Sequence, residues 1–213
     1  LLAGSAMAVI RVAVGVIVFL SAFTFKDDKI GLAFVLGAYA VGGFIGNAVA
    51  PVARKRVREE VILTTCLLSA GALSLLGAIA GGDIVGAALA SLAVATASAA
   101  GRVGFDSLLQ RDGPDAARGR AFARFETRFQ LAWVAGALFG LIPFSEDFGL
   151  FALGFLLVLA GLSYLTALLS ARTAPSRSKL RPQVVDQVWD LTKGRVRSRY
   201  EASRAAKRKL DEQ

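Results

Sequence analysis

Long apolar stretches alternate with short polar ones along the whole first part of the chain. Each apolar stretch is about 20 residues long, the length that an α-helix needs to cross a hydrocarbon core of roughly 30 Å. The stretches are continuously apolar, without residue-by-residue alternation, which favours helices over a transmembrane β-barrel. We therefore expect an all-α polytopic membrane protein with six transmembrane helices. The predicted spans are residues 3–25, 30–53, 61–80, 84–105, 125–144 and 148–171.

The polar segments between these spans differ in length and charge. The turns at 26–29, 81–83 and 145–147 are short, whereas 102–130 is a long interruption rich in both charge signs. We expect this long interruption to form a loop held against the membrane. It leads into the fifth span with an arginine stripe on one face and an aromatic stripe on another.

A second change in composition comes after residue 171. Residues 172–213 hold 12 basic and 5 acidic side chains, whereas residues 1–171 hold 13 and 11. This predicts two domains, a six-helix transmembrane bundle at 1–171 and a basic tail at 172–213. From residue 183 the tail has apolar residues at helical spacing, which is typical of a helix on an anionic membrane surface. A solvated tail is the alternative.

Charge in the connections predicts the orientation in the membrane. The connections at 54–60 and 102–128 and the tail carry 22 basic residues, whereas the turns on the other side carry only Lys26 and Lys29. By the positive-inside rule, the basic connections and both termini are expected in the cytoplasm, with the protein in the inner (plasma) membrane. Anionic lipid headgroups are the expected partners of these residues. Nucleic acid is not expected, because no recognisable binding module accompanies the charge.

The remaining composition excludes several classes of function. The chain has no His and a single cysteine, Cys66, so it offers neither an imidazole ligand nor an internal disulfide. No metal-ligand cluster and no pairing of nucleophile and base is visible, so we expect no metal, no cofactor and no enzyme activity. The chain begins at Leu1, without Met and inside an apolar run, which predicts a piece of a longer protein.

Two pairs of glycines predict close contacts between helices. Gly42 and Gly46 share one face of the second span, and Gly136 and Gly140 share one face of the fifth. Such pairs let helix backbones approach each other in lipid, where no hydrophobic force drives association. They are either the sliding surfaces of a moving protein or ordinary packing positions.

Arg11 lies inside the first apolar run. An arginine at mid-membrane costs at least about 3 kcal/mol, so it is expected to face a cavity or a partner. It is either an anion-binding or gating residue of a transport path, or a side chain that reaches back to the cytoplasmic headgroups.

A cluster of charges is predicted where the fourth span meets the long interruption. Arg102, Asp106 and Gln110 are spaced four apart and share a helix face, and Glu126 lies among the arginines that follow. We expect a cytoplasmic charge cluster that holds one conformation closed, so that neutralising Asp106 shifts the conformational balance. Its expected members are Arg102, Asp106, Gln110, Arg118, Arg120, Glu126 and Arg128.

The stretch from Asp106 to Gly136, DSLLQRDGPD followed by RGRAFARFETRFQLAWVAG, resembles the connection between the tenth and eleventh helices of major facilitator superfamily transporters. It is most similar to the exporter-like branch of actinobacteria. Residues 8–15 resemble the seventh helix of that branch. Residues 46–56 resemble a degraded copy of the superfamily's Gly/Asp/Arg loop motif, without the acidic residue of that motif.

The resemblance implies a twelve-helix fold made of two six-helix halves, of which this chain is the C-terminal one. It also implies alternating access, with an N-terminal half as partner and a substrate held between the halves. We therefore expect a secondary active transporter that exports a small organic molecule. Protons are a candidate coupling ion, although no carboxylate lies deep within any of the six spans, so a coupling carboxylate would lie in the other half.

Five residues are candidates for the substrate path in these spans. Each is alternatively an interfacial anchor or the donor or acceptor of a hydrogen bond between helices. The candidates are Arg11, Tyr39, Asn47, Gln130 and Trp133. The rival function is a non-transporting membrane scaffold or lipid-interacting protein that acts through its basic tail.

Overall fold

A computed structural model describes residues 2–112 and 118–173 of the chain, and every element in them is an α-helix. Contacts divide the chain into residues 1–168 and residues 169–213, and the description below concerns the first unit. The tail predicted at 172–213 lies almost entirely outside the described residues. The helices are α1 (Leu2–Thr24), α2 (Lys29–Arg54), α3 (Glu59–Ile79), α4 (Ile84–Asp112), α5 (Arg118–Gly140) and α6 (Glu146–Thr173).

Five of these helices are long and apolar enough to cross a membrane, namely α1, α2, α3, α4 and α6. The described part of the chain is therefore all-helical, and the lengths and composition of these five helices are those of membrane spans. Helix α5 is long enough but less apolar, because Arg120, Arg124, Glu126 and Arg128 occupy its first half. The sixth predicted span therefore depends on how deeply α5 enters the membrane.

The expectation of a loop at 102–130 is wrong. Helix α4 continues past its predicted end at 105 to Asp112, and α5 begins at Arg118 rather than at 125. The charged residues there continue the helices because pairs spaced four apart, such as Arg102 and Asp106, support helical structure. The other four predicted spans agree with the observed helices to within two residues at each end.

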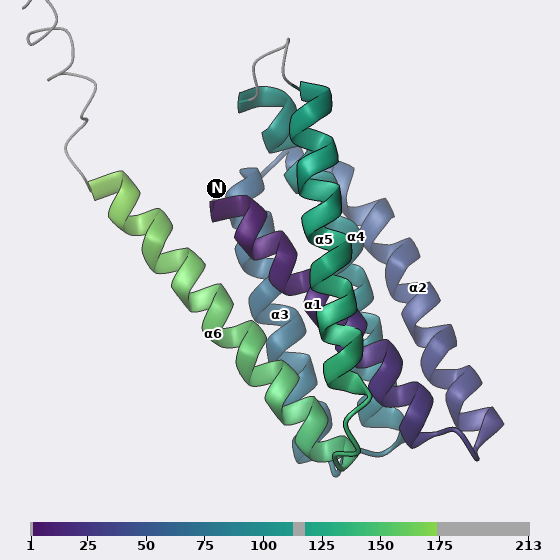
Figure 1. Cartoon of the computed structure of the whole chain (residues 1–213). Coiled ribbons are helices and arrows are strands. Elements are labelled where there is room, and N and C mark those ends of the chain that lie inside the picture. Colours follow the sequence, from purple (N-terminus) through teal and green to yellow (C-terminus); the bar gives the residue numbers. More distant parts are fainter. Residues whose placement is uncertain (1, 113–117, 174–213) are drawn as a thin grey trace, which may run out of the picture. The chain divides into compact units, whose positions relative to one another are not determined.

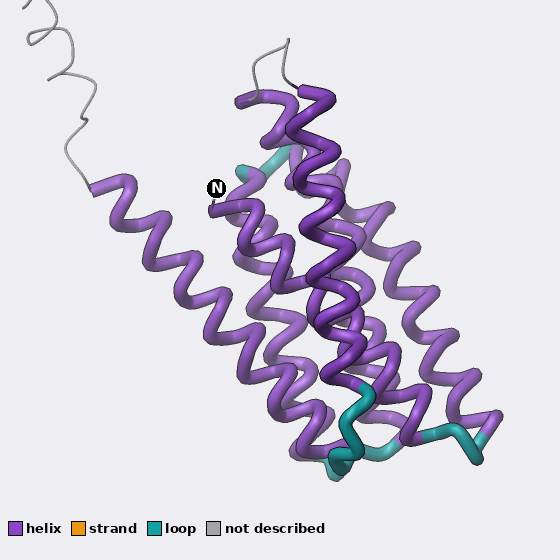
Figure 2. Tube along the Cα trace, viewed as in Figure 1, coloured by secondary structure: helices purple, strands orange, loops and turns teal. Residues whose placement is uncertain are grey.

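Short turns make neighbouring helices antiparallel, as Figures 1 and 2 show. The Asp28 carboxylate accepts a hydrogen bond from the Gly31 N–H at 2.9 Å and so caps the start of α2. Gly81 and Gly82 have positive φ angles of 103° and 62° in the turn before α4. The start of α1, the α2–α3 connection and the facing ends of α4 and α5 consequently lie at one end of the unit (Figure 1).

Helix α4 is the most enclosed of these five helices, because 67% of its 18-residue apolar stretch is buried. The corresponding share for α2 is only 17%. Helices α2 and α3 both pack on α4, and α5 packs on α1. The predicted contacts of the glycine pairs are confirmed. A Cβ at Gly46 would meet the backbone of α4, and one at Gly136 would meet the Val12 carbonyl of α1.

The outward faces of α2, α5 and α6 are apolar. Phe44 on α2 is 79% exposed, Leu131 on α5 is 65% exposed, and Phe155 on α6 is 58% exposed. Large exposed apolar surfaces of this kind are unfavourable in water and favourable against lipid or another apolar surface. The burial pattern thus agrees with the membrane class that the helix lengths indicate.

Candidate functional site

Arg102, in the second half of α4, joins two helices through its guanidinium. Its Nε lies 3.2 Å from Asp106 Oδ2 on the same helix, and its Nη2 lies 3.0 Å from Glu126 Oε2 on α5. The other Glu126 oxygen accepts a hydrogen bond from Gln130 Nε2 at 2.9 Å. We call Arg102, Asp106, Glu126 and Gln130 the Arg102 cluster. Its link between α4 and α5 is a single ion pair.

Arg11, on α1, adds a second cation to this region. It interacts electrostatically with Arg102, Asp106 and Glu126, and also with Tyr39 on α2. Its Nε is buried and has no hydrogen-bond partner among the described residues. The Arg11 side chain thus lies near charged groups of α4 and α5, and both interpretations of Arg11 stay predictions. Four helices thus contribute polar atoms to one region of an apolar unit.

Large aromatic side chains separate α4 from α5 beside this cluster. The Phe105 ring on α4 lies 5.1 Å, centroid to centroid, from the rings of both Phe125 and Phe129 on α5. The backbones of α4 and α5 approach each other closely at few points, whereas those of α1 and α5 do so along most of their length. The aromatic stripe predicted for the membrane interface therefore partly faces inward, and Phe129 is only 2% exposed.

The other predicted members of the charge cluster lie apart from Arg102. The side chains of Gln110 and Arg120 are exposed, and no ion pair involving either is observed among the described residues. Arg128 is exposed, with its guanidinium carbon 5.8 Å from the centre of the Phe125 ring. The Arg118 side chain lies outside the described ones. Of the seven predicted members, the structure brings together Arg102, Asp106 and Glu126.

The five candidate path residues also divide into two groups. Arg11, Tyr39 and Gln130 gather at or beside the Arg102 cluster. Asn47 is exposed on α2, away from any partner that the structure records. Trp133 is half-buried and packs on Phe19 of α1 with the ring centres 5.9 Å apart. Trp133 thus lies at the α1–α5 contact.

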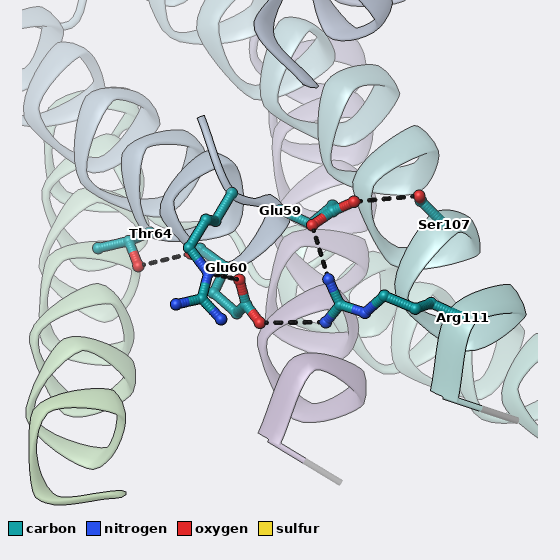
Figure 3. A network of polar contacts seen from close by, with 6 residues as sticks. Glu59, Glu60, Thr64, Ser107 and Arg111 are labelled. Atoms are coloured by element: carbon teal, nitrogen blue, oxygen red, sulfur yellow. Dashed lines mark hydrogen bonds and ion pairs between the residues drawn. The ribbon is translucent and has the colours of Figure 1, made fainter. Parts of the chain in front are cut away.

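A second charge cluster joins the start of α3 to the end of α4 (Figure 3). Arg111 places Nη1 at 3.1 Å from Glu59 Oε2 and Nη2 at 3.3 Å from Glu60 Oε1. The Ser107 hydroxyl donates a hydrogen bond to Glu59 Oε1 at 3.2 Å. We call Glu59, Glu60, Ser107 and Arg111 the Arg111 cluster. One guanidinium therefore holds two neighbouring carboxylates, which also lie favourably in the first turn of α3.

Sequence reasoning missed the Arg111 cluster, although a signal for it existed. Glu59 and Glu60 precede the third span and Arg111 follows the fourth. Antiparallel neighbours place both positions at the same membrane face, so a contact between them could have been expected. The prediction used these residues only to assign the orientation of the spans.

Inside residues 2–112 and 118–173, no group of Cys, Asp or Glu side chains could hold a metal ion. The Arg102 cluster together with Arg11 has two guanidinium groups and two carboxylates. Such a group is formally neutral, and its carboxylates are partly exposed, Asp106 to 32% and Glu126 to 41%.

A protein of Mycobacterium leprae (strain TN) that is described as uncharacterized is similar to this chain, with 28% identity over 187 residues. The match covers 84% of this chain and 32% of the relative, so the chain spans about a third of the length of the curated relative it matches. No protein-family model matches the chain. The search of solved structures likewise found no match.

Proposed function

We propose that this chain forms six membrane spans of a secondary active transporter, which exports a small organic molecule by alternating access. The observation that carries the proposal is Arg11, a half-buried cation within an apolar helix, whose Nε atom is buried without a hydrogen-bond partner among the described residues. A charged side chain in the membrane is costly and by default belongs to a functional site. A scaffold that acts only through its tail has no need of this residue.

The arrangement of the helices supports a protein that moves. Helices α1 and α5 form one closely packed pair, and α2 and α4 form another. The two pairs pack on each other through α1 and α4, and the Arg102–Glu126 ion pair, at 3.0 Å, adds a polar link between them. A shift of one pair against the other would break this bridge and offer Glu126 to Arg11 instead. We propose that this exchange accompanies the opening and closing of the transport path.

The resemblance to the major facilitator superfamily supplies the rest of the proposal. In this interpretation α5 is the fifth span, both ends of the chain are cytoplasmic, and six further spans form a partner half with the rest of the cavity. Only 17% of the apolar stretch of α2 is buried, so its outward face is compatible with such a partner.

Substitution of Arg11 tests the proposal. In the full-length protein, Arg11→Leu is expected to lower transport at least about tenfold without loss of stability, because it removes a charge whose cost within the membrane is at least about 3 kcal/mol. The measurement is uptake of ethidium and of carboxyfluorescein into inside-out vesicles, with thermal unfolding as the second readout. Arg11→Lys is the matched control and should retain part of the activity.

A substrate-independent test uses the accessibility of Tyr39. In a Cys66→Ser background, Tyr39→Cys should react with an impermeant maleimide both in inside-out and in right-side-out vesicles. Reaction from one side only would contradict alternating access. Full transport by Arg11→Leu would contradict the role of Arg11.

Truncation after residue 171 separates the two candidate functions. A transporter should stay largely active without its tail, whereas a scaffold that works through its tail should lose its function.

A further inference from the structure

An apolar groove lies over α4 between α2 and α3. Its volume is about 220 Å³. All three helices contribute small or short side chains to its walls, so the groove is a consequence of side-chain size. Its walls include Val49 and Ala53 on α2, Thr65 and Ser69 on α3, and Ala97 and Ala100 on α4.

Two of the three hydroxyl groups in the groove, those of Ser69 and Thr96, are turned to the helix backbones. Thr96 donates its hydroxyl toward the Gly42 carbonyl at 3.0 Å and the Leu92 carbonyl at 2.8 Å. Ser69 donates toward the Cys66 carbonyl at 3.4 Å. Because these polar atoms are engaged, the groove offers an occupant mainly hydrocarbon surface, and a water molecule would find few partners there.

The length of the groove along the helices matches the thickness of one leaflet of a bilayer. It begins at Val57 in the α2–α3 connection and reaches Ser69 on α3. The helix from Glu59 to Ser69 rises by about 15 Å. That is half of the roughly 30 Å thickness of a hydrocarbon core. A lipid acyl chain that enters from the α2–α3 end would therefore follow the groove to about the middle of the membrane.

Basic residues directly precede Val57, which lines the groove. Lys55 and Arg56 are exposed and form no ion pair with any acidic side chain in the described part of the chain. The nearby Arg58 differs, because its Nε lies 3.6 Å from Glu60 Oε2. Two cations without a protein counter-charge at a membrane surface attract anionic headgroups.

We propose that this groove binds one acyl chain of an anionic phospholipid, with the lipid phosphate held by Lys55 and Arg56. The groove accounts for the hydrocarbon part of the ligand and the two basic residues for its charge. The proposal requires that α2 and α3 cross a membrane, and it is independent of whether the protein transports anything.

Photolabelling of the full-length protein tests this proposal. The protein is placed in vesicles that contain either phosphatidylglycerol or phosphatidylcholine, each with the same diazirine on one acyl chain, and labelled peptides are identified by mass spectrometry. Phosphatidylglycerol should label the α2 and α3 walls of the groove on the order of tenfold more than phosphatidylcholine, because two basic contacts favour the anionic headgroup. Equal labelling by the two lipids would overturn the proposal.

Variants separate the headgroup from the acyl chain. Lys55→Gln combined with Arg56→Gln should remove the preference for phosphatidylglycerol and leave labelling by phosphatidylcholine unchanged. The matched control, Lys26→Gln with Lys29→Gln, removes two exposed lysines from the opposite end and should keep the preference. An equal loss in both double variants would reduce the effect to overall charge and overturn the site.

Filling the groove gives an independent check. Ser69→Phe places a ring in the groove and should lower labelling of its walls by both lipids. Ala72→Phe is the control, because Ala72 is exposed on the same helix and does not line the groove. Unchanged labelling in folded Ser69→Phe would overturn the proposal. If that variant does not fold, the proposal is still tested by the two double variants, because they change only surface side chains.

Discussion

Helix α4 meets α3 and α5 at two junctions that each carry an arginine and two carboxylates, yet the junctions are built differently. At the α3 junction, Gly77 and Gly86 face each other so closely that a Cβ on either would lie 2.6 Å from the other's carbonyl oxygen. At the α5 junction, the Phe105 ring keeps the backbones apart, and no glycine of α5 faces α4. One junction rests on backbone contact and the other on side chains.

The charges of the two junctions differ in the same way. The Glu59 and Glu60 side chains are both 17% exposed and share Arg111, and Glu60 also lies 3.6 Å from the Nε of Arg58. Asp106 and Glu126 are 32% and 41% exposed and share Arg102, while Arg11 offers a second cation nearby. We infer that the Arg111 cluster holds a rigid pair of helices. We propose that the Arg102 cluster, whose carboxylates are more exposed, exchanges partners and permits motion.

The largest expected effect comes from breaking the backbone contact between α3 and α4. Gly86→Leu would force a side chain into the carbonyl of Gly77 and should lower stability by about 3 kcal/mol. Thermal unfolding of the purified full-length protein in detergent measures it. Gly37→Leu is the control, since a Cβ at Gly37 meets nothing within 4 Å. Equal stability of the two variants would show that the α3–α4 contact is not rigid.

A smaller loss of stability is expected from Arg111→Gln. This change leaves Glu59 and Glu60 side by side without their shared cation and should cost about 1 to 2 kcal/mol, with no change in Tyr39→Cys labelling. Arg128→Gln removes an exposed arginine that forms no ion pair among the described residues and should leave stability unchanged. A shift in Tyr39→Cys labelling in Arg111→Gln would show that both junctions move, and would contradict the proposed difference between them.

The smallest change in stability is expected from Glu126→Gln, which should nevertheless alter conformation. The half-exposed ion pair with Arg102 is worth less than about 1 kcal/mol, so Tyr39→Cys labelling should shift roughly fivefold at most while unfolding hardly changes. Asp106→Asn should shift labelling less, because its pair with Arg102 lies within one helix. A larger labelling shift in Asp106→Asn than in Glu126→Gln would show that the Arg102–Glu126 pair is not the contact that moves.

Much of the fold could be predicted from local patterns. The length of each apolar run fixes where a helix can cross a membrane, and short turns with glycine or aspartate make neighbours antiparallel. The spacing of Arg102 and Asp106 predicted their pair, because residues four apart on a helix are neighbours whatever surrounds them. The wrong expectation at 102–130 came from taking charge as the end of a helix. A helix can leave the membrane without ending, since its backbone hydrogen bonds are internal.

The amino-acid sequence by itself determined that the described residues form helices with the lengths and composition of membrane spans, where four of those helices lie, and that Arg102 meets Asp106 along one helix. Only the tertiary structure decided that Arg111 holds both Glu59 and Glu60, that Glu126 reaches Arg102 on another helix, and that the Nε of Arg11 is buried without a partner among the described residues. The reason is physical. Contacts along one helix follow from its fixed rise and turn, whereas contacts between helices depend on the rotation and depth of each one, which the packing of glycines and aromatic rings sets.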